Sequence, residues 1–143
     1  MKPKGWIDEP LYSRIKEIMP IPTVDLVTHR GRLLLMLRNN EPAKDQGFTP
    51  GGRILRGETI DETVRRVLQE ETGLTPEKIT RIGIMEHIWP MTHTVTILHR
   101  VDIADNTVTM NDEHSDYKGV NSAPEDAHPL LRQMIQESKI FQQ

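Results

Sequence analysis

Cysteine is absent from this chain of 143 residues. Disulfide bonds and thiolate metal sites are therefore excluded, and any bound metal ion needs oxygen or imidazole ligands. Such ligands favour Mg²⁺, with Mn²⁺ as the alternative, held through carboxylates. A chain without disulfides also fits a cytoplasmic protein, and we expect that location here.

Long apolar runs and an excess of basic residues are absent as well. The longest apolar run, residues 33–37, is far shorter than the roughly 20 residues that span a bilayer, so we expect no membrane segment. The first ten residues carry positive charge but no apolar stretch, so we expect no signal peptide. The net charge of −3 and the pI of about 6.1 argue against a nucleic-acid partner.

The length and the residue pattern predict one α+β domain over residues 1–143, with helices packed on a central mixed sheet. Helices are expected over residues 10–18 and 59–72 and within 124–141. Strands are expected over residues 23–28, 32–38, 79–89, 92–103 and 117–120, the first two forming a hairpin. Residues 39–46 and 105–112 read as polar connections, and the prolyl-glycyl segment 49–52 reads as a turn.

The most informative segment is the helix that Gly73 ends. At about 100° per residue its apolar residues form one stripe, and Glu71 falls in the middle of that stripe. A carboxylate that points toward a core is costly unless it is paired, protonated or bound to a metal ion. A buried salt bridge of Glu71 with Arg53 or Arg65 is the structural alternative. The helical wheel alone therefore favours a functional Glu71 only modestly.

The spacing of this segment is similar to the sequence motif of the Nudix hydrolases. Eight of the nine fixed positions of that motif are matched, by Gly52, Glu58, Arg66, Leu68, Glu70, Glu71, Gly73 and Leu74. The resemblance extends over most of the chain and implies a mixed β-sheet sandwiched between helices. It also implies an Mg²⁺-dependent enzyme that cuts a nucleoside diphosphate linked to another group.

The one mismatch is Val67, where the Nudix motif has a Glu that often binds metal or activates water. Either the protein is a degenerate binder or its catalytic base lies elsewhere. Within the family, the GDP-mannose mannosyl hydrolases have an aliphatic residue at this position, and the chain resembles that branch outside the motif too. The residues that carry this resemblance are Asp25, Arg38, Asn40, Pro42, Ala43, the segment 50–53, His87 and the segment 112–117.

This second resemblance implies a role for each matching residue. The Gly51 carbonyl, Glu71 and Glu113 would hold Mg²⁺, with Glu70 as an added or water-mediated ligand. Two arginines, Arg38 and Arg53, would bind phosphate oxygens and stabilise the departing diphosphate. His114 would be the general base for water, and Asp25 and His87 would contact the sugar or the base. A homodimer is suggested by the resemblance alone.

Several residues also have ordinary structural readings. His114 lies in a polar loop, where a histidine is usually solvated, and His87 could be a hydrogen-bonded sheet histidine. His93 and His99 read as structural. Trp89 and Met91 could stack on a guanine, but such residues more often fill a core edge or a subunit contact.

Three functions remain open from the sequence. The first is attack of water on the anomeric carbon of a nucleotide sugar, which releases sugar and nucleoside diphosphate. The second is attack on phosphorus of a nucleoside diphosphate derivative, and the third is nucleotide binding without catalysis. Both Glu70 and Glu71 are present, whereas the mannosyl hydrolases keep only the second, and the connection 89–93 is shorter than theirs. The first difference is compatible with a metal site of two carboxylates. The second leaves the identity of the sugar undecided.

Overall fold

The computed structural model of the protein describes residues 5–29, 33–38, 47–103 and 114–141. Along the chain it contains the following elements: α1 (Leu11–Ile18), β1 (Ile21–His29), β2 (Leu33–Arg38), β3 (Gly47–Phe48), β4 (Gly51–Arg53), α2 (Ile60–Thr72), β5 (Pro76–Ile88), β6 (His93–Ile103), β7 (His114–Val120) and α3 (Pro129–Ser138). The predicted helices and longer strands are all present. The predicted connections 39–46 and 105–112 lie outside the described residues.

The strands form one mixed sheet. Its order is β3-β2-β1-β6-β5, with β4 paired to β1 and β7 paired to β2. Strands β1 and β6 run parallel, and the other pairs are antiparallel, including the predicted hairpin of β1 and β2. Proline at the first residue of β5 is tolerated because β5 is an edge strand.

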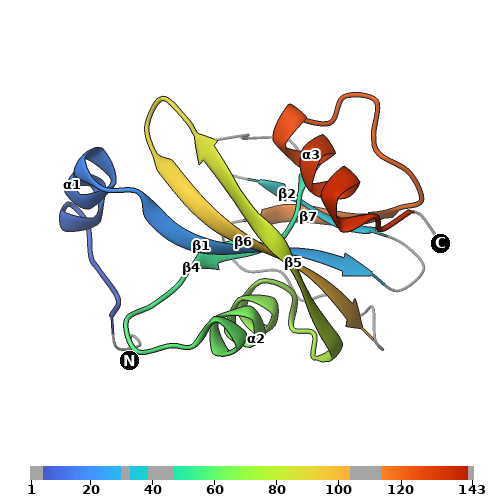
Figure 1. The fold of residues 1–143 in the computed structure, drawn as a ribbon, viewed down its shortest axis with the longest axis horizontal. Coiled ribbons are helices and arrows are strands. Elements are labelled where there is room, and N and C mark those ends of the chain that lie inside the picture. Colours follow the sequence, from blue (N-terminus) through green and yellow to red (C-terminus); the bar gives the residue numbers. More distant parts are fainter. Residues whose placement is uncertain (1–4, 30–32, 39–46, 104–113, 142–143) are drawn as a thin grey trace.

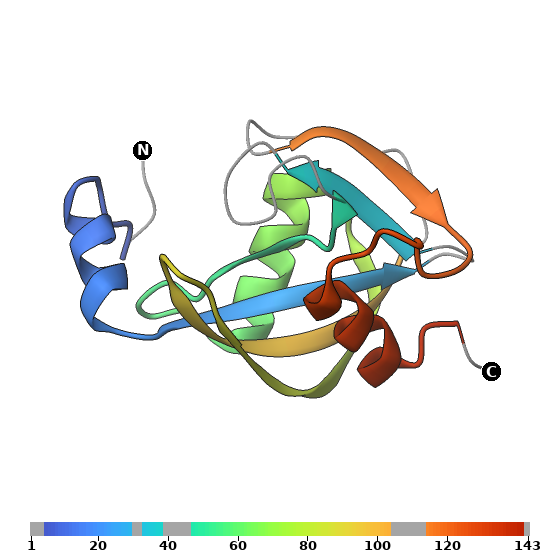
Figure 2. The ribbon, with the colours of Figure 1, turned by 90° about the horizontal axis from the view of Figure 1, so that it is seen from above.

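Helices α2 and α3 cover opposite faces of the sheet, as Figure 2 shows. Two buried apolar clusters fill the two interfaces. The cluster on the α2 side contains Val24, Leu26, Val64 and Leu68, and the cluster on the α3 side is built around Val27, Leu98, Leu131 and Met134. Alternate residues of β1 thus enter different clusters, as a strand buried on both faces requires. The predicted α+β sandwich is confirmed.

Helix α1 takes no part in this sandwich. It lies at one end of the molecule in both views (Figures 1 and 2) and has no buried residue. The connection between β5 and β6 reaches the same end. In the described part of the chain, no helix has both the length and the apolar character that crossing a bilayer would require.

The prediction of a turn over residues 49–52 is wrong in its second half. Gly51 and Gly52 lie in β4, paired with Asp25 and Val24 of β1. The glycines are there because neighbouring groups come close. A Cβ atom at Gly51 would lie 2.5 Å from Asp25 Oδ1, and one at Gly52 would lie 2.9 Å from Val67 Cγ2. Both distances are far too short for real side chains.

Candidate active site

Helix α2 presents Glu71 to the interior because both of its ends are fixed. At the N-terminus, the Thr59 hydroxyl accepts from the Glu62 amide and the Glu62 carboxylate accepts from the Thr59 amide, which is a complete capping box. At the C-terminus, Gly73 takes the left-handed conformation (φ 73°) that ends helices. The apolar stripe between them is buried, and Glu71 on the same stripe is only 4% exposed.

The Glu71 carboxylate meets the backbone of β4. The amide of Gly51 donates a hydrogen bond of 3.0 Å to Glu71 Oε2. The two cations considered as partners for Glu71 are engaged elsewhere: Arg65 pairs with Asp61 at 2.9 Å, and Arg53 donates to the Gly5 carbonyl at 2.7 Å. Glu71 and Gly51, two of the predicted metal ligands, are therefore brought together at the corner between α2 and β4.

Val67 occupies the space beside this corner. It is 2% exposed and belongs to the cluster under α2. Its contact with Gly52 lets the helix approach the strand closely, so the position where the motif has Glu is a packing position here. An aliphatic side chain at residue 67 is therefore part of how α2 is seated on the sheet.

A charged network joins the β4–α2 connection to the helix. Arg66 bonds Glu58 in a fork, with Nε 2.6 Å from Oε2 and Nη2 3.0 Å from Oε1, and Nη2 also donates to the Arg53 carbonyl at 2.8 Å. Glu58 in addition accepts from the Leu55 amide at 2.9 Å. Arg66 Nη1 reaches Glu70 at 3.0 Å, and the Glu70 side chain is 53% exposed.

The pKa values of this network follow from its contacts. Burial would raise the pKa of Glu58, but the hydrogen bonds and charge of Arg66, with the Leu55 amide and the Thr63 hydroxyl, hold it below its ordinary value. Burial would lower the pKa of Arg66, and Glu58 and Glu70 raise it instead. Both groups are therefore charged near neutral pH, and their ion pair holds the β4–α2 connection to the helix.

Asp25 lies on the other side of Gly51, on the face of the sheet that α3 covers. Thr96 of β6 donates a hydrogen bond of 2.6 Å to Asp25 Oδ2. The Asp25 carboxylate occupies the space that a Cβ atom at Gly51 would fill. The Gly51 amide donates its hydrogen bond to Glu71. The backbone of β4 thus separates two carboxylates. Nothing in the spacing of the sequence pointed to Thr96, which lies far from Asp25 along the chain.

His87 belongs to a group of rings on the same face of the sheet. It is 4% exposed, and its Nε2 has no hydrogen-bond partner in the described part of the chain. Its ring meets Trp89 edge-on at 6.4 Å between centroids, and Trp89 lies 5.0 Å from His128. Burial, and secondarily the charge of His128, lower the pKa of His87. His87 is therefore neutral near pH 7.

His128 was not among the predicted site residues. Its Nδ1 accepts from the Leu130 amide and caps α3, whose first residue is Pro129. The sequence signal for it was weak, because a histidine before proline is only one of several ways to begin a helix. The centre of the Phe48 ring lies 6.2 Å from the centre of the His128 ring.

The remaining predicted site residues lie partly or wholly outside the described residues. Glu113 is outside them. Arg38 and His114 are described by their backbones alone, which are paired across β2 and β7. The two residues assigned to phosphate binding and proton transfer are therefore cross-strand neighbours. No group of three or more metal-binding side chains is found within the described residues, which omit Glu113.

Arg53 contacts the N-terminal segment. Besides its bond to the Gly5 carbonyl, its guanidinium lies 5.4 Å from the centre of the Tyr12 ring. The phosphate-binding role of Arg53 stays a prediction.

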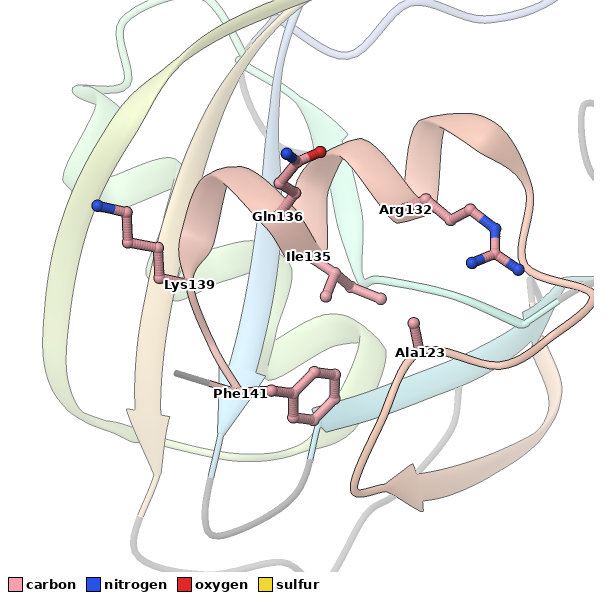
Figure 3. Close-up of a pocket in the computed structure, with 6 residues that line it drawn as sticks. All are labelled: Ala123, Arg132, Ile135, Gln136, Lys139 and Phe141. Carbon is pink, nitrogen blue, oxygen red and sulfur yellow. The ribbon is translucent and has the colours of Figure 1, made fainter. Parts of the chain in front are cut away.

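One pocket, of about 380 Å³, lies on α3 and the segments beside it (Figure 3). It is lined by Ala123, Arg132, Ile135, Gln136, Lys139 and Phe141. None of the predicted site residues is among them, and Arg132 is bonded to the Pro124 carbonyl at 3.1 Å. The pocket is separate from the α2–β4 corner, where the acidic side chains gather.

Together, the mixed sheet between two helices and the acidic α2–β4 corner define a Nudix fold with its motif in place. The chain belongs to the NUDIX domain family, which matches residues 19–141. It is thus a Nudix hydrolase, an enzyme class that acts on nucleoside diphosphate derivatives and generally uses divalent metal ions.

Named relatives and solved structures agree with this assignment. The low-salt glycan biosynthesis protein Agl8 of Haloferax volcanii is 30% identical over 94% of this chain and 92% of its own length. An ADP-ribose pyrophosphatase of Methanocaldococcus jannaschii is 29% identical over 73% of this chain and 65% of its own.

Among solved structures, a MutT NUDIX hydrolase from Burkholderia pseudomallei has a TM-score of 0.74 at 22% identity, covering 83% of this chain and 98% of that one. The NUDIX domain of Shewanella oneidensis NrtR, complexed with ADP ribose, has a TM-score of 0.69 at 22% identity, covering 93% and 97%. At these identities the likeness concerns the fold.

Proposed function

We propose that this Nudix hydrolase cleaves a nucleotide sugar of the GDP-mannose type by attack of water on the anomeric carbon. The observation that carries the proposal is the burial of Val67 against Gly52. The position at which the motif has a glutamate is occupied here by a buried valine, so the catalytic base must come from another element. The similarity to the Haloferax relative, a glycan biosynthesis protein, supports a substrate that carries a sugar.

The residues at the α2–β4 corner fit a hard divalent ion. Glu71 offers a buried carboxylate beside Gly51, and Glu70 offers a second one on the same turn of α2. In the proposal, Glu71, the Gly51 carbonyl and Glu113 hold Mg²⁺ or Mn²⁺, with Glu70 as an added ligand. The bound ion would neutralise charge on the diphosphate.

The protein's own groups would divide the remaining work. Arg38 and Arg53 bind phosphate oxygens, and Asp25 and His87 contact the sugar or the base from the other face of the sheet. His114 takes a proton from water as the water oxygen bonds to the anomeric carbon. The bond from that carbon to the diphosphate oxygen breaks, and its electron pair leaves with the nucleoside diphosphate.

A second candidate is attack on phosphorus. The presence of both Glu70 and Glu71 favours it, as does the relative named an ADP-ribose pyrophosphatase. Its products would be nucleoside monophosphate and sugar phosphate. The proposal further places the enzyme in the cytoplasm, in keeping with its cysteine-free composition, and gives it a nucleotide derivative as its ligand.

Turnover of a nucleotide-sugar panel in H₂¹⁸O separates the two candidates. Carbon attack puts ¹⁸O into the free sugar and leaves the nucleoside diphosphate unlabelled. Phosphorus attack puts ¹⁸O into a phosphate. Labelled phosphate with every substrate would overturn the first candidate, and binding without turnover at any Mg²⁺ concentration would overturn both.

The base is tested by His114→Gln, with His93→Gln as the matched control. A general base contributes about 10²–10⁴ in rate, so we expect kcat to fall by that order with little change in KM. The acid limb of the kcat profile should disappear with it. If His114→Gln keeps that limb and a near-normal kcat, the base is another group.

A further inference from the structure

The large apolar side chains that remain exposed are gathered at one end of the molecule. Among the described residues they are Trp6, Leu11, Ile18, Met19, Ile84, Ile88 and Met91, each more than half exposed. Every one belongs to the N-terminal segment with α1 or to β5 and the connection that follows it. The C-terminal end of β5 and the connection to β6 lie at the same end of the molecule as α1, opposite the described C-terminal residues (Figures 1 and 2). Exposed apolar surface concentrated in this way marks an interaction site.

The first part is the outer stripe of α1. Leu11, Ile15 and Ile18 recur at the spacing that places residues on one helix face, and Leu11 and Ile18 are 59% and 72% exposed. Arg14 stands three residues after Leu11 and four before Ile18, so it lies on the same stripe. This helix stripe has an apolar body with a cation in its middle.

The second part is an uncovered area of the sheet. Ile84 is paired with Ile97, and Glu86 is paired with Val95, so these four residues share one face, and Ile88 lies two residues beyond Glu86 on that face. We call the area formed by Ile84, Ile88, Val95 and Ile97 the sheet patch. Glu86 stands between Ile84 and Ile88, so the sheet patch has an anion in its middle.

The sheet patch continues the face that α2 covers. Val24 is level with Ile97 in the parallel pair of β1 and β6, and Val24 is fully buried under α2. Next to it, Ile84 and Ile88 are 72% and 74% exposed. Helix α2 thus covers one part of this face and leaves the part toward the β5–β6 connection without a covering helix in the described chain.

Helix α1 is held away from the sheet patch of its own copy. Only Met19 and Pro20 separate it from β1, and Met19 is extended (φ −140°, ψ 142°). Ile84 and Ile88 stay exposed in the single copy and α1 buries none of its residues, so α1 does not cover the sheet patch of its own chain. Arg53 also fixes the N-terminal segment at the side of β4 through Gly5 and Tyr12.

We propose that two copies of this chain dimerise about a two-fold axis, with the α1 stripe of each copy covering the sheet patch of the other. In this arrangement a helix packs on an uncovered face of a sheet. The charges are complementary as well, because Arg14 lies opposite Glu86 of the second copy. In the described part of the chain neither Arg14 nor Glu86 takes part in an ion pair. A two-fold axis makes the contact twice, which closes the assembly at two copies.

The inference goes beyond the proposed reaction and does not depend on it. It also gives Met91 a place at the edge of a subunit contact. The homodimer suggested by the family resemblance receives here a definite surface and a definite charge pair, both of which can be altered without touching the α2–β4 corner.

The test is sedimentation equilibrium of the full chain with charge reversals. Glu86→Arg and Arg14→Glu should each raise the dimer dissociation constant at least tenfold, because each places like charges in both contacts. The double variant, which restores opposite charges, should recover most of the affinity. Glu77→Arg, a reversal at the far end of the same strand, is the matched control and should leave the dimer unchanged.

A second variant, Ile88→Asp, tests the apolar part and should give a monomer with an unchanged circular dichroism spectrum, since the side chain is exposed in the single copy. The proposal is overturned if the wild-type chain is monomeric at about 100 µM, a concentration at which weak interfaces are occupied. It is equally overturned if a dimer forms but ignores both Glu86→Arg and Ile88→Asp, since another face would then carry it.

Discussion

Helices α1 and α2 are both amphipathic, yet they are held in different ways. Helix α2 has a capping box, a glycine C-cap, a buried apolar stripe and an ion pair to the preceding connection. Helix α1 begins after Pro10 without a side-chain cap, and it buries none of its residues. An apolar stripe in a sequence therefore says that a face will be covered, but not by which surface or by which copy of the chain.

The largest effect should come from the polar residue in the α2 stripe. Glu71→Gln keeps the size of the side chain and removes the charge that a divalent ion would meet, so we expect activity to fall by several orders of magnitude and metal affinity to weaken. The thermal midpoint should change little. Turnover, metal titration and melting are the measurements, with Glu77→Gln as the exposed control. Unchanged metal affinity would remove Glu71 from the metal site.

Leucine-to-alanine substitutions in α2 and α1 compare the packing of the two helices directly. Leu68 of α2 is fully buried, and Leu68→Ala should cost about 2–5 kcal/mol of unfolding free energy. Leu11 of α1 is 59% exposed, and Leu11→Ala should cost at most about 0.5 kcal/mol when measured at a concentration where the chain is monomeric. Denaturant titration of both variants measures the difference. Equal losses would mean that α1 packs on its own copy after all.

Val67→Glu introduces the carboxylate that the family motif has. The side chain at residue 67 is packed against Gly52, so a charged group there should cost at least about 2 kcal/mol of stability. Activity on nucleotide sugars should not rise. Val67→Gln serves as the uncharged control for size. A gain in turnover would instead favour a degenerate motif that a single residue can restore.

A smaller loss of stability is expected at the ion pair that joins α2 to the preceding connection. Glu58→Gln removes the bidentate charged partner of the partly buried Arg66, which keeps its ion pair with the exposed Glu70, and should cost about 1–3 kcal/mol. The exposed pair of Arg65 and Asp61 is the comparison, and Arg65→Gln should cost about 0–1 kcal/mol. Denaturant midpoints measure both. Similar costs would show that Glu58 and Arg66 contribute no more than a surface pair.

The smallest effect concerns acid. Burial lowers the pKa of His87 and of His99, so the unfolded chain binds protons first as the pH falls. Their contribution to stability is complete above about pH 6.5 and is lost as the pH falls through the folded pKa values. The lowered pKa of Glu58 acts later, below its ordinary value of 4.5. Midpoints between pH 7.5 and 5.5 should therefore fall in the wild type and fall less in His87→Gln.

The sequence predicted the fold well because the relevant signals are local. Apolar periodicity marked the helices and long strands, and Gly73 marked the end of α2. The short strands β3 and β4 were missed, since two or three residues carry no periodicity. Gly51 and Gly52 were mistaken for a turn, because a glycine that permits close approach looks the same in a sequence as one that permits a bend.

The candidate site was predictable only where it follows the helical motif. Glu71 faces the interior as the helical wheel indicated, and Gly51 lies beside it. The bond from Thr96 to Asp25 and the approach of Trp89 to His128 join distant parts of the chain, and no spacing rule anticipates them. The contact of Arg53 with Tyr12 was missed for the same reason.

The side-chain bonds that fasten the β4–α2 connection have a consequence for amide hydrogen exchange. The amides of Leu55 and Thr59 lie in irregular backbone, where exchange is ordinarily fast, but each donates to a glutamate carboxylate, of Glu58 and Glu62 respectively. Because Arg66 of the helix holds Glu58, the connection can open only when the helix itself loosens. This connection should therefore exchange as one cooperative unit with α2, protected like regular structure although it contains none.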